Sequence, residues 1–510
     1  MYSALTMNQK VYRSRIWKKF VRKKAVDRAR MQQTELRRAL DLIDLTTFGI
    51  ANTFGLGVYV LAGMGARVAG PGICVSHFIV GVATTITALC YGELAAAVPR
   101  SGSVYSYTYV LMGEFMAFIF GWLQCLENII GVACLGGGLS TYIDNMIDNK
   151  LADYFAEINI PVVLAEPNVF AAFLIAICSC ILVGGVELSV TFQKLLTFLN
   201  LTTLTIIIVI GVCNADLKNW SWKPGDEDFP TDGSGGSGGF FPFGFHGVLV
   251  ITRHCVYAYR GFEGISCAGE EAKNPRKLIP LAILLTLIIA SVSYIGVAVA
   301  LTLMWPYFDE SITSPFPYAL DMTNMHNVKW VVSTGILFCL CACLLGNTYT
   351  CTRVLYSMGA DGLILKWFGK VNSKTKTPIF STVATALLSG AFAIILGTDD
   401  FVRTIVSIVN LVSHTVVSVC VLLLRYRNVH EQCSQHEQDG SPIRMEVLLN
   451  LKAHSKTPTA QSYLIVKITI LIMCLLIYFS YGIGHSVENT EKEQPSESGS
   501  CFQSNSASMT

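Results

Sequence analysis

The sequence is poor in charged residues. Asp, Glu, Lys and Arg make up only 14% of its 510 residues, whereas hydrophobic residues make up 52%. A soluble globular domain carries about 25% charged residues, so this chain lacks the charge needed to cover a water-facing surface of its size. The composition therefore excludes an ordinary soluble protein and favours one that is embedded in lipid.

Motifs for enzymatic chemistry are also missing. The sequence has no nucleotide-binding loop, no zinc-type cysteine spacing and no constellation of nucleophile and base. Most of its 17 cysteines, such as Cys339, Cys341 and Cys343, lie in apolar runs, where cysteine behaves as a small hydrophobic residue. No cleavable signal peptide is visible, because the first apolar run begins only near Leu45. We expect no enzyme, no cofactor and no bound metal.

Eleven apolar stretches are long enough to cross a bilayer, whose core of about 30 Å needs about 20 helical residues. They lie at about 44–63, 73–97, 115–140, 163–184, 193–213, 245–268, 279–304, 328–357, 379–397, 404–424 and 462–484. We predict an all-α polytopic membrane protein. Its parts are a basic N-terminus (1–40), a ten-helix core (41–427), a loop (428–461), a last helix (462–484) and a disordered tail (485–510).

Positive charge predicts the orientation of these spans. Twelve Lys and Arg residues lie between Lys10 and Arg38, and basic residues also follow the even-numbered spans. This pattern places the N-terminus and the loop 428–461 in the cytoplasm, and we favour it over a nucleic-acid-binding arm. The sequon at Asn219 then lies in an outer acidic loop, where it is either glycosylated or left unused.

Two spans contain residues that are unusual at the middle of a membrane. In the first, Gly55 and Gly57 flank a single residue, and in the sixth, Gly261 and Gly264 stand beside the charged Arg260. Glycine weakens a helix, and freed backbone groups are tolerated in lipid only where something else satisfies them. The start of a half-helix suits a carboxylate and unwound carbonyls suit an ammonium, so two such breaks suit an amino acid zwitterion.

Interruptions in the first and sixth spans are the signature of a transporter built from two inverted repeats of five helices. The alternative is that these glycines only let neighbouring helices pack closely. Two interruptions at corresponding places in the two halves favour the transporter. Its expected partners are an amino acid substrate and the lipid bilayer, with no nucleic acid.

Several long segments carry a family resemblance. They are FGLGVYVLAG (54–63), LCYGELAAAVPRSGSVYSYTYV (89–110), YAYRGFEGISCAGEEAKNPRKLIP (257–280) and LLGNTYTCTRVLYSMGADGL (344–363). These segments resemble the cationic amino acid transporters of the amino acid–polyamine–organocation superfamily. The resemblance implies a ten-helix inverted-repeat core in the plasma membrane that transports arginine, lysine and ornithine by alternating access without sodium.

The resemblance also implies how the site is built. The substrate carboxylate meets backbone amides of the first break, the ammonium meets carbonyls of both breaks, and Tyr257 or Tyr259 closes over the substrate. Asn200 stands where proton-coupled relatives carry a lysine, as in uncoupled members. The implied substrate-binding residues are Asn52, Thr53, Phe54, Gly55, Leu56, Gly57, Val256, Tyr257, Ala258, Tyr259, Arg260 and Gly261.

Three features depart from the family pattern. Met64 stands where the family has an acid, Arg260 stands where it has an apolar residue, and we count eleven spans where the family has fourteen. A guanidinium about 6 Å from a bound cation costs about 2–3 kcal/mol at an effective dielectric near 20, unless an acid such as Glu263 neutralises it. We therefore assign Met64, Glu263 and Asn200 to gating or selectivity. Altered selectivity, including neutral substrates, and a non-transporting member stand as alternatives to cationic transport.

Overall fold

The computed structural model describes residues 20, 22–24, 34–147, 150, 168–230, 233–309, 314–396 and 400–433. Within these residues the regular structure is helical, apart from an isolated bridge between Leu40 and Ala272. The longer helices are α2 (Leu42–Thr53), α3 (Leu56–Ala69), α4 (Ile73–Ala97), α5 (Val104–Leu111), α6 (Glu114–Met146), α8 (Val169–Val183), α9 (Val186–Cys213), α10 (Gly244–Ala258), α12 (Pro275–Met304), α13 (Pro315–Met322), α14 (His326–Ala360), α15 (Ile379–Leu396) and α16 (Asp400–Cys433). Short helical turns lie at Gly70–Gly72, Leu217–Trp220, Tyr307–Asp309 and Lys366–Gly369, and α11 is Gly264–Cys267.

The predicted spans correspond to these helices. The first span is divided between α2 and α3, and the sixth between α10 and α11, while the other spans up to the tenth each overlap one helix. Six of the described helices are long and apolar enough to cross a membrane by length and composition. The predicted last helix, 462–484, lies outside the described residues. The expectation of an all-α polytopic protein with two discontinuous helices is confirmed.

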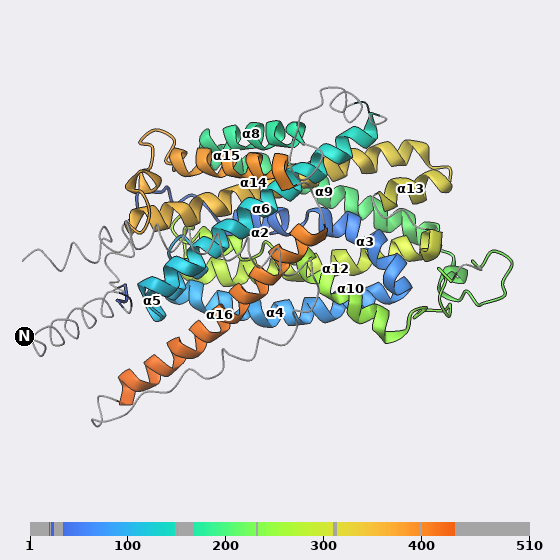
Figure 1. Ribbon diagram of the computed structural model, residues 1–510, viewed down its shortest axis with the longest axis horizontal. Helices are drawn as coiled ribbons and strands as arrows, with labels where there is room; N and C mark the ends of the chain where they lie inside the picture. Colours follow the sequence, from blue (N-terminus) through green and yellow to red (C-terminus); the bar gives the residue numbers. More distant parts are fainter. Residues whose placement is uncertain are drawn as a thin grey trace, which may run out of the picture.

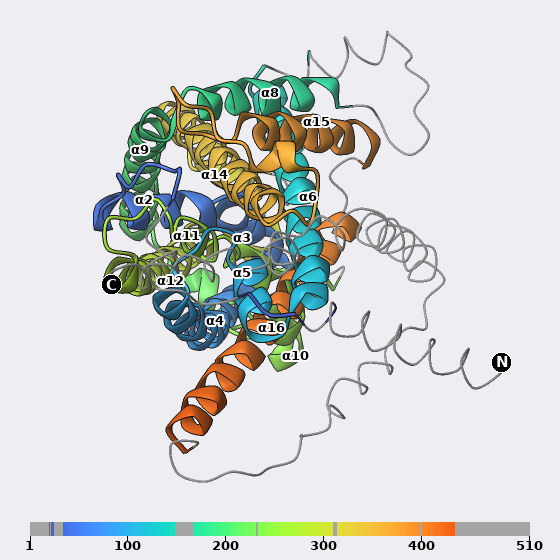
Figure 2. The same cartoon turned by 90° about the vertical axis from the view of Figure 1, so that its left-hand side faces the viewer.

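Helices at corresponding positions of the two halves pack against each other. The second span, α4, lies along the seventh, α12; the third, α6, along the eighth, α14; and the fourth, α8, along the ninth, α15. In Figures 1 and 2, α8 and α15 form one outer layer, α4, α10 and α12 lie on the opposite side, and the broken pair α2 and α3 runs between them. This arrangement places both helix breaks at the centre of the bundle.

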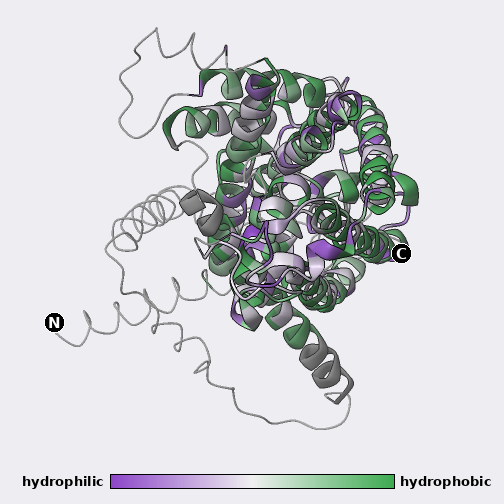
Figure 3. Cartoon of the chain, turned by 90° about the vertical axis from the view of Figure 1, so that its right-hand side faces the viewer, coloured by the Kyte–Doolittle hydropathy of each residue, from purple (hydrophilic) through white to green (hydrophobic). Residues whose placement is uncertain are grey.

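The polarity of the bundle is that of a protein in lipid. Large apolar side chains face outward, including Phe198 on α9, 67% exposed, and Leu387 on α15, 70% exposed. Figure 3 shows hydrophobic residues over much of the helical periphery. Buried positions, in contrast, include ionisable and amide side chains such as Glu114, Glu271 and Asn200. An extensive apolar surface of this kind is normally covered, and here the bilayer covers it.

Buried ion pairs close the end of the bundle that the charge pattern predicts to be cytoplasmic. Glu271 follows α11, and its carboxylate accepts hydrogen bonds from Arg353 Nη2 at 2.8 Å and from the hydroxyl of Tyr349. The backbone carbonyl of Glu271 accepts hydrogen bonds from the N–H groups of Ala39 and Leu40, each at 3.0 Å. Glu271 therefore joins α14 to the segment that precedes α2.

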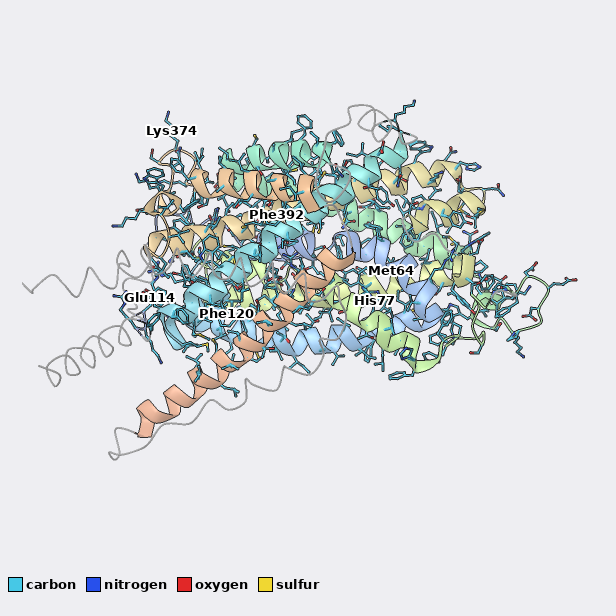
Figure 4. All side chains as sticks on the ribbon, in the orientation of Figure 1. Met64, His77, Glu114, Phe120, Lys374 and Phe392 are labelled. Carbon is cyan, nitrogen blue, oxygen red and sulfur yellow. The ribbon has the colours of Figure 1, made fainter. Side chains whose placement is uncertain are left out.

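A second pair lies at the same end. Glu114, the first residue of α6, accepts hydrogen bonds from Arg22 Nε at 3.0 Å and from the Tyr109 hydroxyl at 2.9 Å. Figure 4 shows Glu114 at this end of the bundle, far along it from Met64. Lys24 pairs in turn with Asp361, directly after α14. Basic residues of the N-terminal segment thus bind the ends of α6 and α14.

We predict that Arg353→Ala destabilises the protein, because it leaves the Glu271 carboxylate buried without its cation. Removing one partner of a buried ion pair costs about 3–5 kcal/mol. The measurement is the thermal unfolding midpoint of detergent-purified protein. The double variant with Glu271→Gln should recover much of the loss, and a single variant as stable as the wild type would contradict the prediction.

Candidate functional site

The first break separates α2 from α3. At Phe54 the backbone becomes extended (φ −78°, ψ 122°), although its N–H still donates to Ile50 O at 2.8 Å. Gly55 follows with a φ of −157° and a ψ of −140°, and α3 then begins at Leu56. A Cβ at Gly55 would lie 2.9 Å from Cys343 Sγ on α14, so a side chain there has no room. The first N–H groups of α3 have no partner within their own helix and point into the break.

The second break follows α10, which ends at Ala258. The chain turns through Tyr259 to Glu263 before α11 begins at Gly264. Gly261 has a φ of +118°, and a Cβ on it would lie 2.3 Å from the backbone oxygen of Asn52. Both the left-handed conformation and the close approach require glycine here. The two breaks are therefore in direct contact, as the predicted site requires.

Tyr294, on α12, ties the two breaks together. Its hydroxyl lies 3.0 Å from the carbonyl oxygen of Thr53 and 2.6 Å from that of Ala258, so its single proton is shared between the last residues of α2 and α10. Sequence reasoning missed this residue, because a lone tyrosine in an apolar span usually only packs. Its hydrogen bonds satisfy carbonyls that neither broken helix can satisfy itself.

Asn52 makes a second link between the breaks. Its Nδ2 donates to Gly261 O at 2.9 Å and lies 3.3 Å from Thr350 Oγ1 on α14. Its Oδ1, and Oγ1 of the neighbouring Thr53, are buried and receive no hydrogen bond from the part of the chain that the structure describes. Buried polar atoms are normally hydrogen-bonded, so these two oxygens are available to a ligand or a water molecule.

A small polar cavity lies where the breaks meet. Its volume is about 20 Å³, and it is lined by Asn52, Thr53, Gly55, Gly57, Leu135, Tyr257, Ala258, Arg260, Cys343 and Asn347. Seven of the twelve residues implied by the family resemblance are in this set. Such a volume holds about one water molecule, which is less than any amino acid needs. The helices around the cavity must move apart before a substrate fits.

Four of the other implied residues, Phe54, Val256, Tyr259 and Gly261, do not line the cavity. The ring of Phe54 packs against that of Tyr294 at 5.5 Å, and the Tyr259 hydroxyl donates to the carbonyl of His77 on α4 at 3.1 Å. Tyr257 is therefore the aromatic residue at the cavity. Gly261 contacts Asn52, Val256 is not among the lining residues, and the Leu56 side chain lies outside the described part of the structure.

Arg260 faces the cavity and is neutralised from α6. Its Nε donates to Glu127 Oε1 at 2.8 Å, and its Nη2 lies 3.3 Å from Asn128 Oδ1. Glu263 was only an example of an acid that could neutralise Arg260, and its carboxylate accepts the N–H of Gly261 at 2.9 Å and stabilises the turn. Sequence reasoning missed Glu127, although an acid inside a span is a functional candidate by default.

Met64 and Asn200 lie outside the cavity. Met64 is on α3, two turns beyond Gly57, and is not among the lining residues (Figure 4). Asn200, on α9, accepts a hydrogen bond from the Tyr59 hydroxyl at 2.5 Å, and both side chains are buried. This amide therefore fixes α3 against α9 without introducing a charge.

The sequon asparagine is also built into the fold. Asn219 is only 5% exposed, its Nδ2 donates to Leu303 O at 2.8 Å, and its Oδ1 accepts from Trp222 Nε1 at 3.2 Å. A glycan would be attached through Nδ2, so in this fold a glycosylated Asn219 would lose its hydrogen bond to Leu303.

In this helical membrane bundle, two broken helices enclose a polar cavity. This is the architecture of transporters with discontinuous helices. The chain belongs to the amino acid permease family, which matches residues 40–492. It resembles a substrate-bound, outward-open Na⁺-coupled sialic acid symporter in fold, with a TM-score of 0.50 and 10% identity over 76% of this chain and 79% of that one.

Curated relatives agree with the family. The chain is 34% identical to Cationic amino acid transporter 4 of Homo sapiens, over 84% of this chain and 66% of that protein. It is 33% identical to Cationic amino acid transporter 4, vacuolar, of Arabidopsis thaliana, over 80% and 67%. It is 32% identical to the Methylthioribose transporter of Bacillus subtilis (strain 168), over 78% and 84%. The chain thus spans about two thirds of the length of the cationic amino acid transporters it matches.

We predict that Tyr294→Phe lowers the rate of amino acid uptake at least tenfold at an unchanged surface level. The variant removes the hydrogen bonds that join the two breaks through the carbonyls of Thr53 and Ala258. Each buried carbonyl left without a hydrogen bond costs about 1–3 kcal/mol. Tyr307→Phe is the matched control, since its buried hydroxyl donates to Gly235 O at 2.7 Å far from the cavity. Both variants should lower the thermal unfolding midpoint, but only Tyr294→Phe should lower uptake. Equal uptake by the two variants would show that the bridge has no part in transport.

Proposed function

We propose that the protein moves L-α-amino acids across the membrane by alternating access, with the zwitterion held between the two helix breaks. The observation that carries this proposal is that both breaks meet at one polar cavity. The first N–H groups of α3 suit the substrate carboxylate, because a helix N-terminus binds anions. Carbonyls near Asn52 and Ala258, with Asn52 Oδ1 and Thr53 Oγ1, suit the ammonium.

The small size of the cavity is part of this mechanism. Gly57 of α3 lies so close to α10 that a Cβ on it would be 2.7 Å from Cα of Ala258. Moving α3 and α10 apart enlarges the cavity and opens it, and their return encloses the substrate. A cavity of about 20 Å³ is then the contracted form of the site. The contact at Gly57 makes this closure possible, because glycine adds no side chain between the two helices.

Two substrate classes fit this scheme. The names of the human and plant relatives favour cationic amino acids. The family resemblance of the sequence implies arginine, lysine and ornithine as these substrates, transported without sodium. The Arg260–Glu127 pair favours neutral amino acids, since the group that faces the cavity is already a cation. We place the N-terminus in the cytoplasm, because the basic segment 10–38 fits that side. The family resemblance of the sequence favours the plasma membrane.

The test is uptake into proteoliposomes that contain the purified full chain, in buffers with and without sodium. Labelled arginine, lysine, alanine, serine and leucine are compared, and their methyl esters and decarboxylated amines serve as competitors. We expect uptake of at least one amino acid without sodium, and no competition by compounds that lack a free carboxylate. Empty liposomes and Gly57→Val, whose side chain blocks closure against Ala258, should both be inactive.

Three results would contradict the proposal. The decarboxylated amines competing as well as the amino acids would rule out recognition of the zwitterion by the breaks. Wild-type uptake by Gly57→Val would rule out closure of α3 on α10. Binding of an amino acid without transport of any would identify a non-transporting sensor.

A further inference from the structure

We infer that Arg260 occupies the part of the site that would otherwise receive the substrate side chain, so that the transporter selects amino acids with small, uncharged side chains. This inference deepens the proposed function and rests on it. It concerns the substrate selectivity of the site between the two breaks, where the guanidinium of Arg260 lies at the cavity.

The guanidinium is held in place by several contacts. Arg260 comes from the break after α10, and its side chain crosses to α6, where Glu127 Oε1 and Asn128 Oδ1 bind Nε and Nη2. Nη2 also lies 3.3 Å from the backbone oxygen of Glu127. Only 6% of the Arg260 surface is exposed, so the side chain does not extend into a water-filled vestibule.

The backbone of α6 is shaped around this side chain. A Cβ at Gly131 would lie 2.4 Å from Nη1 and 2.9 Å from Nη2 of Arg260. The guanidinium therefore packs directly against the backbone of α6 at Gly131, which has no side chain. Leu135, one turn further along α6, lines the cavity together with Arg260. The space beside the breaks is thus filled by an arginine side chain that belongs to the protein.

The charges at the cavity argue against a cationic substrate side chain. Among the described residues, no carboxylate lines the cavity. Glu127 is bound to Arg260, and Glu263 accepts the N–H of Gly261. A lysine or arginine side chain would meet a guanidinium and leave its own charge unpaired. An acidic side chain would find that guanidinium already neutralised by Glu127. A small, uncharged side chain avoids both costs.

The experiment compares alanine and arginine in wild-type and variant proteoliposomes. In the wild type, unlabelled alanine or serine should compete for alanine uptake at least tenfold better than arginine or lysine. Arg260→Ala vacates the guanidinium space and leaves the Glu127 carboxylate facing it. We expect this variant to raise arginine uptake at least tenfold relative to alanine uptake.

Two further variants isolate the cause. In R260A/E127Q the guanidinium is removed and no carboxylate remains beside the vacated space. The gain in arginine uptake seen with Arg260→Ala should therefore disappear. Leucine uptake should rise, because its larger apolar side chain fits the vacated space. Arg353→Ala is the matched control, because it removes a guanidinium from another buried pair, Arg353–Glu271, that does not line the cavity. It should leave the ratio of arginine to alanine uptake unchanged. Thermal unfolding of each purified variant reports whether it is folded.

The outcomes separate this inference from the proposed function. A wild type that takes arginine as well as alanine overturns the inference and leaves amino acid transport intact. An unchanged ratio in a folded R260A variant also overturns it. A wild type that neither transports nor binds any amino acid overturns the proposed function itself. The wild-type comparison needs no variant, so it decides the selectivity even if R260A does not fold.

Discussion

The structure depends on backbone groups that two helices expose in the middle of a membrane. Lipid offers no hydrogen bonds, so each freed carbonyl or N–H group must find a partner inside the protein. Tyr294 of α12 donates its hydroxyl proton to the carbonyls of Thr53 and Ala258, and Asn52 at the first break donates to the carbonyl of Gly261 in the second. Groups left over at the meeting point face the cavity. The same constraint that brings the breaks together therefore creates a place for a zwitterion.

Buried ion pairs serve a similar purpose in a chain with few charges. Arg22–Glu114, Arg260–Glu127 and Arg353–Glu271 each join segments far apart in the sequence, and α6 supplies an acid to two of them. A buried pair adds little net stability, because desolvation offsets most of the attraction. Loss of either partner is costly, however, and such pairs therefore fix geometry. They hold α6 against the N-terminal segment at one end and against the second break at the centre.

Sequence reasoning found what is encoded locally. Gly55 and Gly261 mark the breaks within a few residues, and apolar length marks the spans, so the fold class was predictable. Most of the cavity lining was named through the family resemblance. Partners distant in the sequence were not. Glu263 was named as an example of an acid that could neutralise Arg260, yet its carboxylate accepts the N–H of Gly261 in a tight turn, while α6 brings Glu127 from 133 residues away. Tyr294 gave no signal because its role depends on where α12 packs.

Magnitudes decide which effect excludes a cationic side chain. A guanidinium about 6 Å from a bound cation costs about 2–3 kcal/mol at an effective dielectric near 20, but Glu127, about 3 Å further away, returns about 2 kcal/mol of this. The remaining repulsion is worth less than a factor of ten in affinity. Desolvating a charge without a partner costs several kcal/mol per ion, and this cost exceeds the repulsion. The decisive feature is therefore that Arg260 already uses the carboxylate a cationic substrate would need, and the positive charge of Arg260 is secondary.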